Sequence, residues 1–494
     1  MSLAWATLVL LPAISTWTDG TNRFFYFWQR SDGLALIVSI LILAACGYLL
    51  YLAERRLASR ALTRIGAVLF VLTLIDGVLG YMLSDNKVNH DGRDALVWAA
   101  VSALALAAMA YTRWRLVNLA TKACLFMVPL TAIVAVQVLS WPSWDTRTGQ
   151  LDPHPIETEG PHPPVFLFIF DEWSARRSTQ SGQFLPFFKN LGELAAHATV
   201  YTHALSDGMD TEISLPRILY SQMGRLQAGG GAQVLWQAKE SRSAVADVPN
   251  IFQLARHKGY TTAMLGYYLP YRVLLGDAVD YVVTYPHVPK SERLMGKVLL
   301  TLLSGETLLP DPVNRTIGRR VSAQVYSRNW VGLNHELRDR FRAVLKSARE
   351  RSFVIVHFPL PHAPFVYNPD GSYRGPFRGE ILEGSAADYE RSLRYLDVVI
   401  GDFVNDLKRA GVYDSALVIL TSDHSWRLDP DSAVRSTPDA FRRVPLLVKW
   451  PGEGAGVIDR PFCLSGLREV IARALDESPG TTAPCTTGWQ VQGH

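Results

Sequence analysis

The apolar residues of the chain follow two patterns that change near residue 165. Up to residue 139, five long apolar stretches follow one another with short polar connections between them. Most of them approach the ~20 residues that a helix needs to cross a bilayer, and the first is short. The pattern predicts a multi-pass α-helical membrane domain of about five helices over residues 1–139. The stretches are residues 2–17, 33–52, 66–83, 95–110 and 120–139.

Positively charged residues between these stretches predict the orientation of the domain. Residues 53–64 carry four arginines, and the connection before the fifth stretch carries Arg113, Arg115 and Lys122, whereas the other two connections hold two basic residues each. Because excess Lys and Arg mark the cytoplasmic side, we expect the first terminus inside and everything after residue 140 outside. A signal peptide is the alternative for the first stretch, which lacks a basic leader and a clear small-residue cleavage site.

After residue 165, short apolar runs alternate with amphipathic segments. The run at residues 165–170 is continuously apolar, which is typical of a strand buried on both faces. This alternation favours a mostly parallel sheet covered by helices, an α/β/α sandwich over residues 165–494. The proline-rich residues 140–164 are the expected linker. Further strands are predicted at residues 262–266, 353–358, 416–421 and 444–449, and helices at residues 185–197, 333–349 and 387–410.

Residues 294–309 have Leu and Met at helical spacing, with a single lysine, Lys297. We expect this segment to form a helix that packs against its own domain. A position on the membrane surface is the alternative.

Charge and cysteine content narrow the functional classes. The formal net charge is +4 and the pI about 8.8, which gives no reason to expect nucleic acid as a partner. Of the four cysteines, only Cys463 and Cys485 lie in the polar part of the chain. In an oxidising compartment these two can form a disulfide, which their spacing alone does not decide.

Acidic and imidazole side chains follow three of the predicted strands. Asp171 and Glu172 follow the first strand, and Asp423 and His424 follow the strand at residues 416–421. The strand at residues 353–358 leads into His357-Phe-Pro-Leu-Pro-His362. Because ligands gather beyond the carboxyl ends of parallel strands, we expect these groups to surround one site.

Thr211 lies where residues 206–221 change from a loop to a short helix, with Pro216 tolerable only in the first turn. Free backbone N–H groups and the positive end of the helix dipole favour an alkoxide and an incoming phosphate or sulfate oxygen there. Thr211 is therefore a candidate nucleophile. The alternative is that Thr211 or Asp210 only caps the helix.

These groups suit a bound divalent cation. A threonine hydroxyl is nearly inert at neutral pH, and a coordinated cation favours its alkoxide. Carboxylates from two strands and an imidazole suit zinc or manganese, and an all-oxygen subset suits calcium. We expect one divalent metal ion, zinc before manganese or calcium.

The order of these motifs resembles that of the alkaline-phosphatase superfamily. Phe-Asp171-Glu172, the Thr211 loop and helix, His-x-x-x-x-His362-Ala-Pro and Thr-Ser-Asp423-His424 look most like the sulfatase-like, membrane-anchored phosphoethanolamine and phosphoglycerol transferases. The resemblance covers roughly residues 163–452, and the helical front end is similar too.

The resemblance implies roles for these residues. It makes Thr211 the nucleophile, and it places the metal on Glu172, Asp423 and His424 with Thr211 and Asp171. His357 and His362 would contact the phosphate or its leaving oxygen. It also implies a metal-dependent transfer from a membrane phospholipid to an envelope lipid or glycan. The enzyme would lie in a bacterial-type inner membrane, with its catalytic domain in the periplasm.

The chain departs from the family pattern after His424. The glycine that usually follows Asp-His is Ser425, and the next histidine is His494 at the end of the chain. A second metal site is therefore not expected. Arg427 or Arg435 is a candidate for a bidentate contact to a phosphate, or else an exposed surface residue.

Three alternative functions are open. A sulfatase would need a formylglycine made from Ser214, but Arg217 stands one residue too early for the sulfatase pattern. A phosphodiesterase-type hydrolase would share every residue named above. A non-catalytic membrane scaffold for envelope assembly is the alternative of another class.

Overall fold

We describe the protein from a computed structural model. It covers residues 2–14, 30–57, single positions in 64–75, 92–112, 122, 128–140, 147–148, 162–228, 234–285, 294–303, 319–347, 351–377, 384–430 and 441–476, except residues 12 and 240. The chain divides into two compact units, Met1–Trp144 with Lys290–Tyr326, and Asp145–Pro289 with Ser327–His494. Each unit is described by itself.

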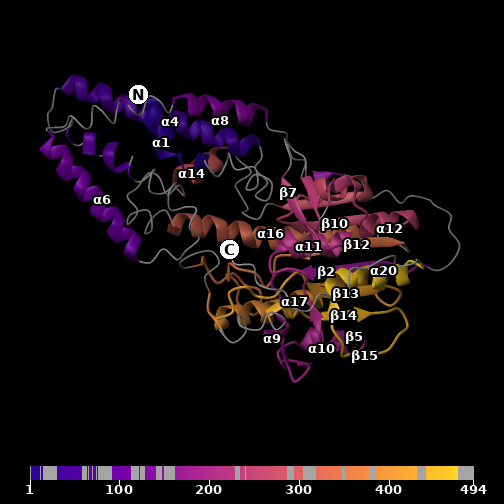
Figure 1. Ribbon diagram of the computed structural model, residues 1–494. Helices are drawn as coiled ribbons and strands as arrows, with labels where there is room; N and C mark the ends of the chain where they lie inside the picture. The colour runs from indigo at the N-terminus through magenta and orange to yellow at the C-terminus, as the bar shows by residue number, and fades with distance from the viewer. Residues whose placement is uncertain are drawn as a thin grey trace. The chain divides into compact units, whose positions relative to one another are not determined.

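The described part of the first unit is helical (Figure 1), and its N-terminal helices are apolar. Within α4 (Arg30–Leu57), residues Arg30–Ala53 are long and apolar enough to cross a membrane. Among the described residues this is one such helix, so a single candidate span is seen where five were predicted. Most of the stretch at 66–83 and part of that at 120–139 lie outside the described residues. The other helices described before residue 145 are α1 (Ser2–Val9), α6 (Gly92–Tyr111) and α8 (Val128–Ser140).

Helix α14 (Leu294–Leu303) belongs to this first unit and packs against α4. Its Lys297 forms a buried ion pair with Asp32, at 2.9 Å from Asp32 Oδ1, and donates to Ser31 Oγ at 2.7 Å. The expected packing of this segment against the catalytic domain is therefore wrong. Helix α14 packs within the first unit, where α4 supplies Asp32 as the partner of its buried lysine.

The second unit is built on a nine-stranded sheet, in the order β1-β11-β10-β12-β2-β13-β14-β5-β15. The five strands from β11 to β13 are parallel, which confirms the mostly parallel sheet. The predicted strand at residues 444–449 is β14, which runs antiparallel to β13. The strands are β1 (Arg147–Thr148), β2 (Val165–Phe170), β5 (Thr199–Tyr201), β10 (Thr261–Tyr267), β11 (Tyr281–Tyr285), β12 (Ser352–Phe358), β13 (Leu417–Ser422), β14 (Leu446–Lys449) and β15 (Gly456–Ile458).

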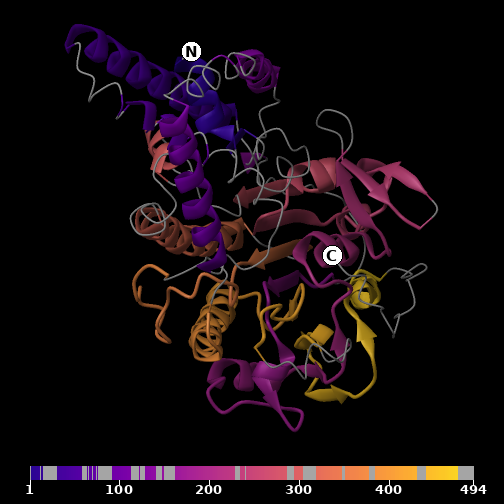
Figure 2. The same ribbon diagram turned by 60° about the vertical axis from the view of Figure 1, so that its left-hand side comes forward.

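Helices cover both faces of this sheet (Figure 2). On one face, Phe341 of α16 (Arg319–Ser347) and Phe403 of α17 (Ala386–Arg409) both pack on Phe168 of β2. On the other face, Phe252 of α12 (Ile251–His257) packs on Phe353 of β12. The central strands are consequently buried on both faces, which explains their continuously apolar sequences.

The predicted helices appear with shifted ends. The prediction at 387–410 corresponds to α17, which Ser385 and Asp388 begin with a capping box. The prediction at 333–349 covers the second half of α16, and that at 185–197 contains α10 (Lys189–Ala195). The linker expected at 140–164 lies largely outside the described residues, although Arg147 and Thr148 pair with β11. Cys463 is disulfide-bonded, and Cys485 lies outside the described residues.

Candidate active site

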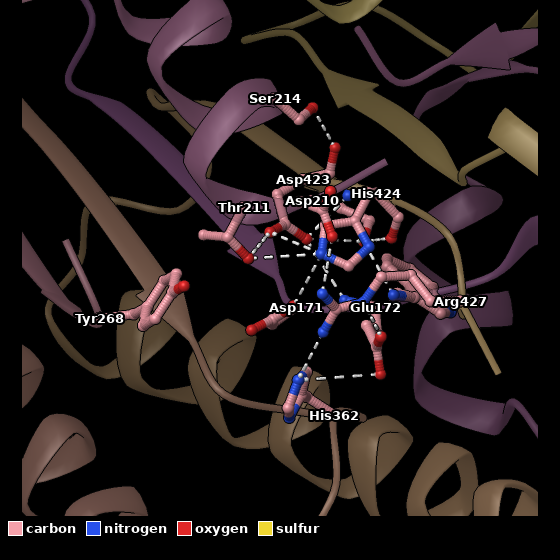
Figure 3. Close-up of polar contacts among 12 residues, drawn as sticks. Asp171, Glu172, Asp210, Thr211, Ser214, Tyr268, His362, Asp423, His424 and Arg427 are labelled. Atoms are coloured by element: carbon pink, nitrogen blue, oxygen red, sulfur yellow. Dashed lines mark hydrogen bonds and ion pairs between the residues drawn. The ribbon is translucent and has the colours of Figure 1, made fainter. Parts of the chain in front are cut away.

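Thr211 is the first residue of α11 (Thr211–Tyr220). Asp210 occupies the N-cap position, yet its side chain makes no capping hydrogen bond. The Thr211 hydroxyl donates to Asp423 Oδ2 at 2.8 Å and lies 3.3 Å from His424 Nε2 (Figure 3). Capping alone does not account for Thr211, because its buried hydroxyl faces residues that follow a different strand.

Asp423 and His424 follow β13 and are fully buried. His424 Nδ1 lies 2.9 Å from the Ser425 carbonyl oxygen. Because a carbonyl only accepts, Nδ1 carries the hydrogen, and Nε2 of the neutral ring keeps its lone pair. That nitrogen lies 3.5 Å from both Asp171 Oδ1 and Asp423 Oδ2. A histidine that binds a metal through one ring nitrogen typically donates a hydrogen bond from the other, which fixes its orientation. His424 has this arrangement, with Nδ1 bonded to the carbonyl and Nε2 facing the carboxylates.

Asp171 and Glu172 form a sharp turn after β2. Glu172 has a φ of 62°, in the left-handed region that costs a residue with a side chain about 1–3 kcal/mol. Tyr389 holds the turn by donating its hydroxyl to the Glu172 carbonyl oxygen at 2.5 Å, and the Glu172 N–H donates to Asp423 Oδ1 at 3.3 Å. A strained turn that buried partners hold at a strand exit is typical of a functional site.

Asp171, Asp423 and His424 form a group whose ligand atoms all lie within 4.8 Å of one another. Asp171 Oδ2 accepts from the Tyr267 hydroxyl, whereas its buried Oδ1 has no hydrogen-bond partner among the described residues. Burial, and then the negative charge of Asp423, raise the pKa of Asp171 well above its usual range. Two carboxylates, one oriented imidazole and an unmatched carboxylate oxygen fit a divalent cation.

Glu172 has a cationic partner in the protein, Arg427. Arg427 Nε donates to Glu172 Oε1 at 2.7 Å, and Nη1 donates to Asp210 Oδ1 at 2.8 Å. Burial alone would raise the pKa of Glu172, but His362 and Arg427 hold it at about 2. Burial alone would lower the pKa of Arg427, but Glu172 and Asp210 raise it above its usual range. Arg427 thus faces the site, while Arg435 lies outside the described residues.

His357 and His362 reach the same site from β12 and the segment after it. His362 Nε2 lies 3.2 Å from Arg427 Nη2, and its Nδ1 lies 2.5 Å from the Ala363 carbonyl oxygen, so both ring nitrogens have partners. His357 Nδ1 lies 2.7 Å from the Tyr271 hydroxyl, and its Nε2 is 3.9 Å from Asp423 Oδ2. Burial lowers the pKa of both histidines, that of His357 to about 4. Both imidazoles are therefore expected to be neutral near pH 7.

Ser214, the residue that a sulfatase would convert, lies one turn into α11. Its hydroxyl donates to the Asp423 carbonyl oxygen, and its side chain is fully buried. Thr211, not Ser214, places its oxygen beside the ligand atoms of Asp423 and His424. The geometry thus favours a threonine nucleophile over a formylglycine.

Sequence reasoning missed three tyrosines at the exit of β10. Tyr267 donates to Asp171, Tyr268 donates to Glu212 beside Thr211, and the Tyr271 hydroxyl lies against His357. Tyr268 has a φ of 72°, a second strained residue near Thr211. Three tyrosines within five residues are visible in the sequence, but they point to the site only once β10 is known to lie beside β12.

The site combines a buried hydroxyl, a fitting place for a divalent cation and several nitrogen donors. Such an arrangement can transfer a group from an anionic ester to the hydroxyl, since a cation and donors offset the charge that develops on phosphorus or sulfur oxygens.

Comparison with known proteins places this site in a wider context. The family model described as Sulfatase matches residues 163–463. A lipoteichoic acid synthase from Staphylococcus saprophyticus subsp. saprophyticus is 36% identical over 125 residues, which make up 23% of this chain and 18% of that protein. The match thus spans less than a fifth of that relative.

Solved structures are similar at low identity. The lipoteichoic acid synthase LtaP from Listeria monocytogenes is 12% identical, with a TM-score of 0.40 over 65% of this chain and 73% of that chain. A phosphonate monoester hydrolase from Silicibacter pomeroyi is 18% identical, with a TM-score of 0.44 over 64% of this chain and 74% of that chain.

Proposed function

The chain belongs to the sulfatase family, a group of enzymes within the alkaline-phosphatase superfamily, and from this membership we propose that it is a phosphoryl-group transferase. In this proposal Thr211 is the nucleophile, a membrane phospholipid is the donor, and an envelope lipid or glycan is the acceptor. The transferred group is phosphoethanolamine or phosphoglycerol.

One observation carries the proposal. The Thr211 hydroxyl lies at the N-terminus of α11, within 2.8 Å of Asp423 Oδ2 and 3.3 Å of His424 Nε2. A simple cap would direct its oxygen to the N–H groups of its own helix. A hydroxyl directed at two proposed metal ligands instead supports the activation of Thr211 for attack.

Asp171, Asp423 and His424 would hold the divalent ion, with the Thr211 oxygen beside them. Glu172, which the family resemblance also assigns to the metal, would have to exchange Arg427 for the ion. When bound, the ion lowers the pKa of the threonine hydroxyl and polarises the phosphoryl oxygens. Zinc suits this mixed nitrogen and oxygen set best, with manganese or calcium as alternatives.

The reaction has two displacements. In the first, Thr211 Oγ forms a bond to phosphorus while the bond from phosphorus to the diacylglycerol oxygen breaks. Thr211 passes its proton along the hydrogen bond to Asp423, and the leaving diacylglycerol oxygen takes up one proton in exchange, so the step neither gains nor loses protons. In the second, the acceptor oxygen forms the bond to phosphorus and gives up its proton, the bond from phosphorus to Thr211 Oγ breaks, and the threonine oxygen takes up that proton. In this proposal His357 donates to the phosphoryl oxygens, and Arg427 supplies positive charge beside them, held by its contact with His362 Nε2. The direct contact of His362 with the phosphate that the family resemblance implies would require the ring to give up its present partners.

A membrane-bound donor and acceptor agree with the N-terminal apolar stretches. We propose that these cross the membrane several times, α4 among them, and that the catalytic domain lies on the outer side. The disulfide at Cys463 supports an oxidising compartment. The partial similarity to a lipoteichoic acid synthase supports an envelope polymer or lipid as acceptor.

The test is covalent labelling of Thr211. Full-length protein incubated with donor phospholipid should carry a new mass on the tryptic peptide of residues 190–217, and Thr211→Ala should carry none and lose transfer at least 10³-fold. The mass distinguishes phosphoethanolamine from phosphoglycerol. Thr211→Ser is the matched control, because it keeps the hydroxyl and should still be labelled. Full transfer by Thr211→Ala would disprove the proposal, and a formylglycine at Ser214 would indicate a sulfatase.

A further inference from the structure

Tyr271 and His357 form a buried pair beside Asp423, one of the three residues that could hold the metal ion. Tyr271 begins α13 (Tyr271–Leu275), and His357 is the sixth residue of β12. Both side chains are fully buried, with the Tyr271 oxygen 2.7 Å from His357 Nδ1. The Tyr267 ring stacks on the imidazole at 4.8 Å between ring centroids. The imidazole is therefore held in one orientation.

Gly266 makes room for this pair. A Cβ at Gly266 would lie 2.6 Å from the Tyr271 ring and 3.1 Å from His357 Cβ. Because residue 266 of β10 has no side chain, Tyr271 and His357 can contact each other beside it.

The surroundings fix which nitrogen of His357 carries the hydrogen. In the neutral ring one nitrogen donates and the other accepts. If Nδ1 donated to Tyr271, the buried tyrosine O–H would have no acceptor among the described residues, and the Nε2 lone pair would face the Asp423 carboxylate. If Tyr271 donates to Nδ1, its hydrogen is used and Nε2–H points toward Asp423, which is the favourable arrangement.

That Nε2–H donor is not satisfied by the described residues. His357 Nε2 is buried without a hydrogen-bond partner, and 3.9 Å from Asp423 Oδ2 is too far for a hydrogen bond. The same Asp423 oxygen accepts from Thr211. His357 Nε2 and the Thr211 hydroxyl thus lie beside the same Asp423 oxygen, which brings a group bonded to Thr211 close to this donor.

We propose that Tyr271 is a positioning residue that, through its hydrogen bond to Nδ1, holds His357 in the tautomer that offers Nε2–H to a phosphoryl oxygen of the group in transfer. The inference rests on the proposed function. In this inference Tyr271 does not touch the substrate. It determines which nitrogen of His357 donates to the substrate. Removing one such preorganised donor typically lowers turnover about 10²–10³-fold.

The experiment measures Thr211 labelling by a phospholipid donor in full-length, zinc-loaded protein, together with zinc content. Tyr271→Phe should lower the labelling rate at saturating donor about tenfold or more, with little change in the half-saturating donor concentration or in zinc content. Tyr260→Phe is the matched control. It also removes one buried tyrosine hydrogen bond, to the Pro163 carbonyl oxygen, but away from the site, and it should keep the wild-type rate.

Substitutions of His357 distinguish positioning from mere packing. In His357→Gln the side-chain amide nitrogen can occupy the position of His357 Nε2, so this variant should retain part of the labelling rate. In His357→Asn the amide nitrogen occupies the position of Nδ1, so this variant should not. Adding Tyr271→Phe to His357→Gln should cause no further loss in rate.

Four outcomes would overturn the inference. They are a wild-type rate in Tyr271→Phe, equal rates in His357→Gln and His357→Asn, a further loss in the double variant, or loss of zinc from the His357 variants, which would make His357 a metal ligand. No label on the wild-type protein would instead overturn the proposed function, and the role of Tyr271 with it.

Discussion

Two adjacent carboxylates, Asp171 and Glu172, sit in opposite electrostatic surroundings. Glu172 is paired with Arg427, whereas Asp171 lies beside Asp423 with one oxygen unmatched. We expect Asp171→Asn to lower the affinity for zinc about tenfold or more, because the variant removes one of the charged groups that would hold the ion. Glu172→Gln should have a smaller effect. Zinc titration of the two variants measures this, and an equal or larger loss in Glu172→Gln would show that the ion takes Glu172 from Arg427.

Buried histidine predicts a pH dependence of stability. Burial lowers the pKa of His357 to about 4, and a histidine in an unfolded chain titrates near 6.5. Between these values the unfolded state binds more protons at this residue, so the stability that His357 contributes is complete above pH ~6.5 and decreases as pH falls toward ~4, by about 3 kcal/mol. Thermal unfolding of the full-length protein should show this decrease.

His357→Gln should flatten part of that profile. His257, an exposed residue near the end of α12, offers the control, because His257→Gln removes a histidine without changing a buried group. A slope that is the same in His357→Gln and wild type would contradict the assignment.

At the scale of single elements, β10 depends on a glycine. Gly266→Ala would force a Cβ against Tyr271 and His357, so we expect a loss of about 1–3 kcal/mol in unfolding free energy and slower Thr211 labelling. Gly332→Ala in α16 is the contrast, since nothing lies within 4 Å of its Cβ position. It should be neutral or stabilise by about 0.5–1 kcal/mol. Chemical denaturation compares the two, and similar effects would contradict the steric explanation.

The strands, and the group of Asp171, Asp423 and His424, could be predicted because parallel strands end at one edge and their apolar runs are easy to see. The tyrosines of the β10 exit could not. Tyr267 and Tyr271 resemble core aromatics in sequence, and their hydroxyls matter only because β10 pairs with β12 and brings them to Asp171 and His357. Likewise, the pairing of Arg427 with Glu172 joins residues 255 positions apart, which no local pattern reveals.

At the scale of the whole molecule, Lys297 and Asp32 join distant parts of the chain within the first unit. Each single substitution takes the counter-charge away from a buried charged side chain, so Lys297→Met or Asp32→Asn should each cost about 3–5 kcal/mol of unfolding free energy. The double variant should lose less unfolding free energy than the two single variants added together. As a contrast, Glu390→Gln, which breaks the exposed Arg394–Glu390 pair, should change the unfolding free energy by less than about 1 kcal/mol. Thermal unfolding in detergent tests this, and additive losses would exclude a direct pairing.

The return of α14 to α4 bears on how the protein responds to proteolysis. A protease that cuts between residues 148 and 162 divides the polypeptide into two fragments. The larger fragment still carries α14, which remains attached to the smaller one through its packing on α4 and the Lys297–Asp32 pair. Such a cut would nick the protein without shedding the catalytic part, and shedding would require α14 to leave α4 as well.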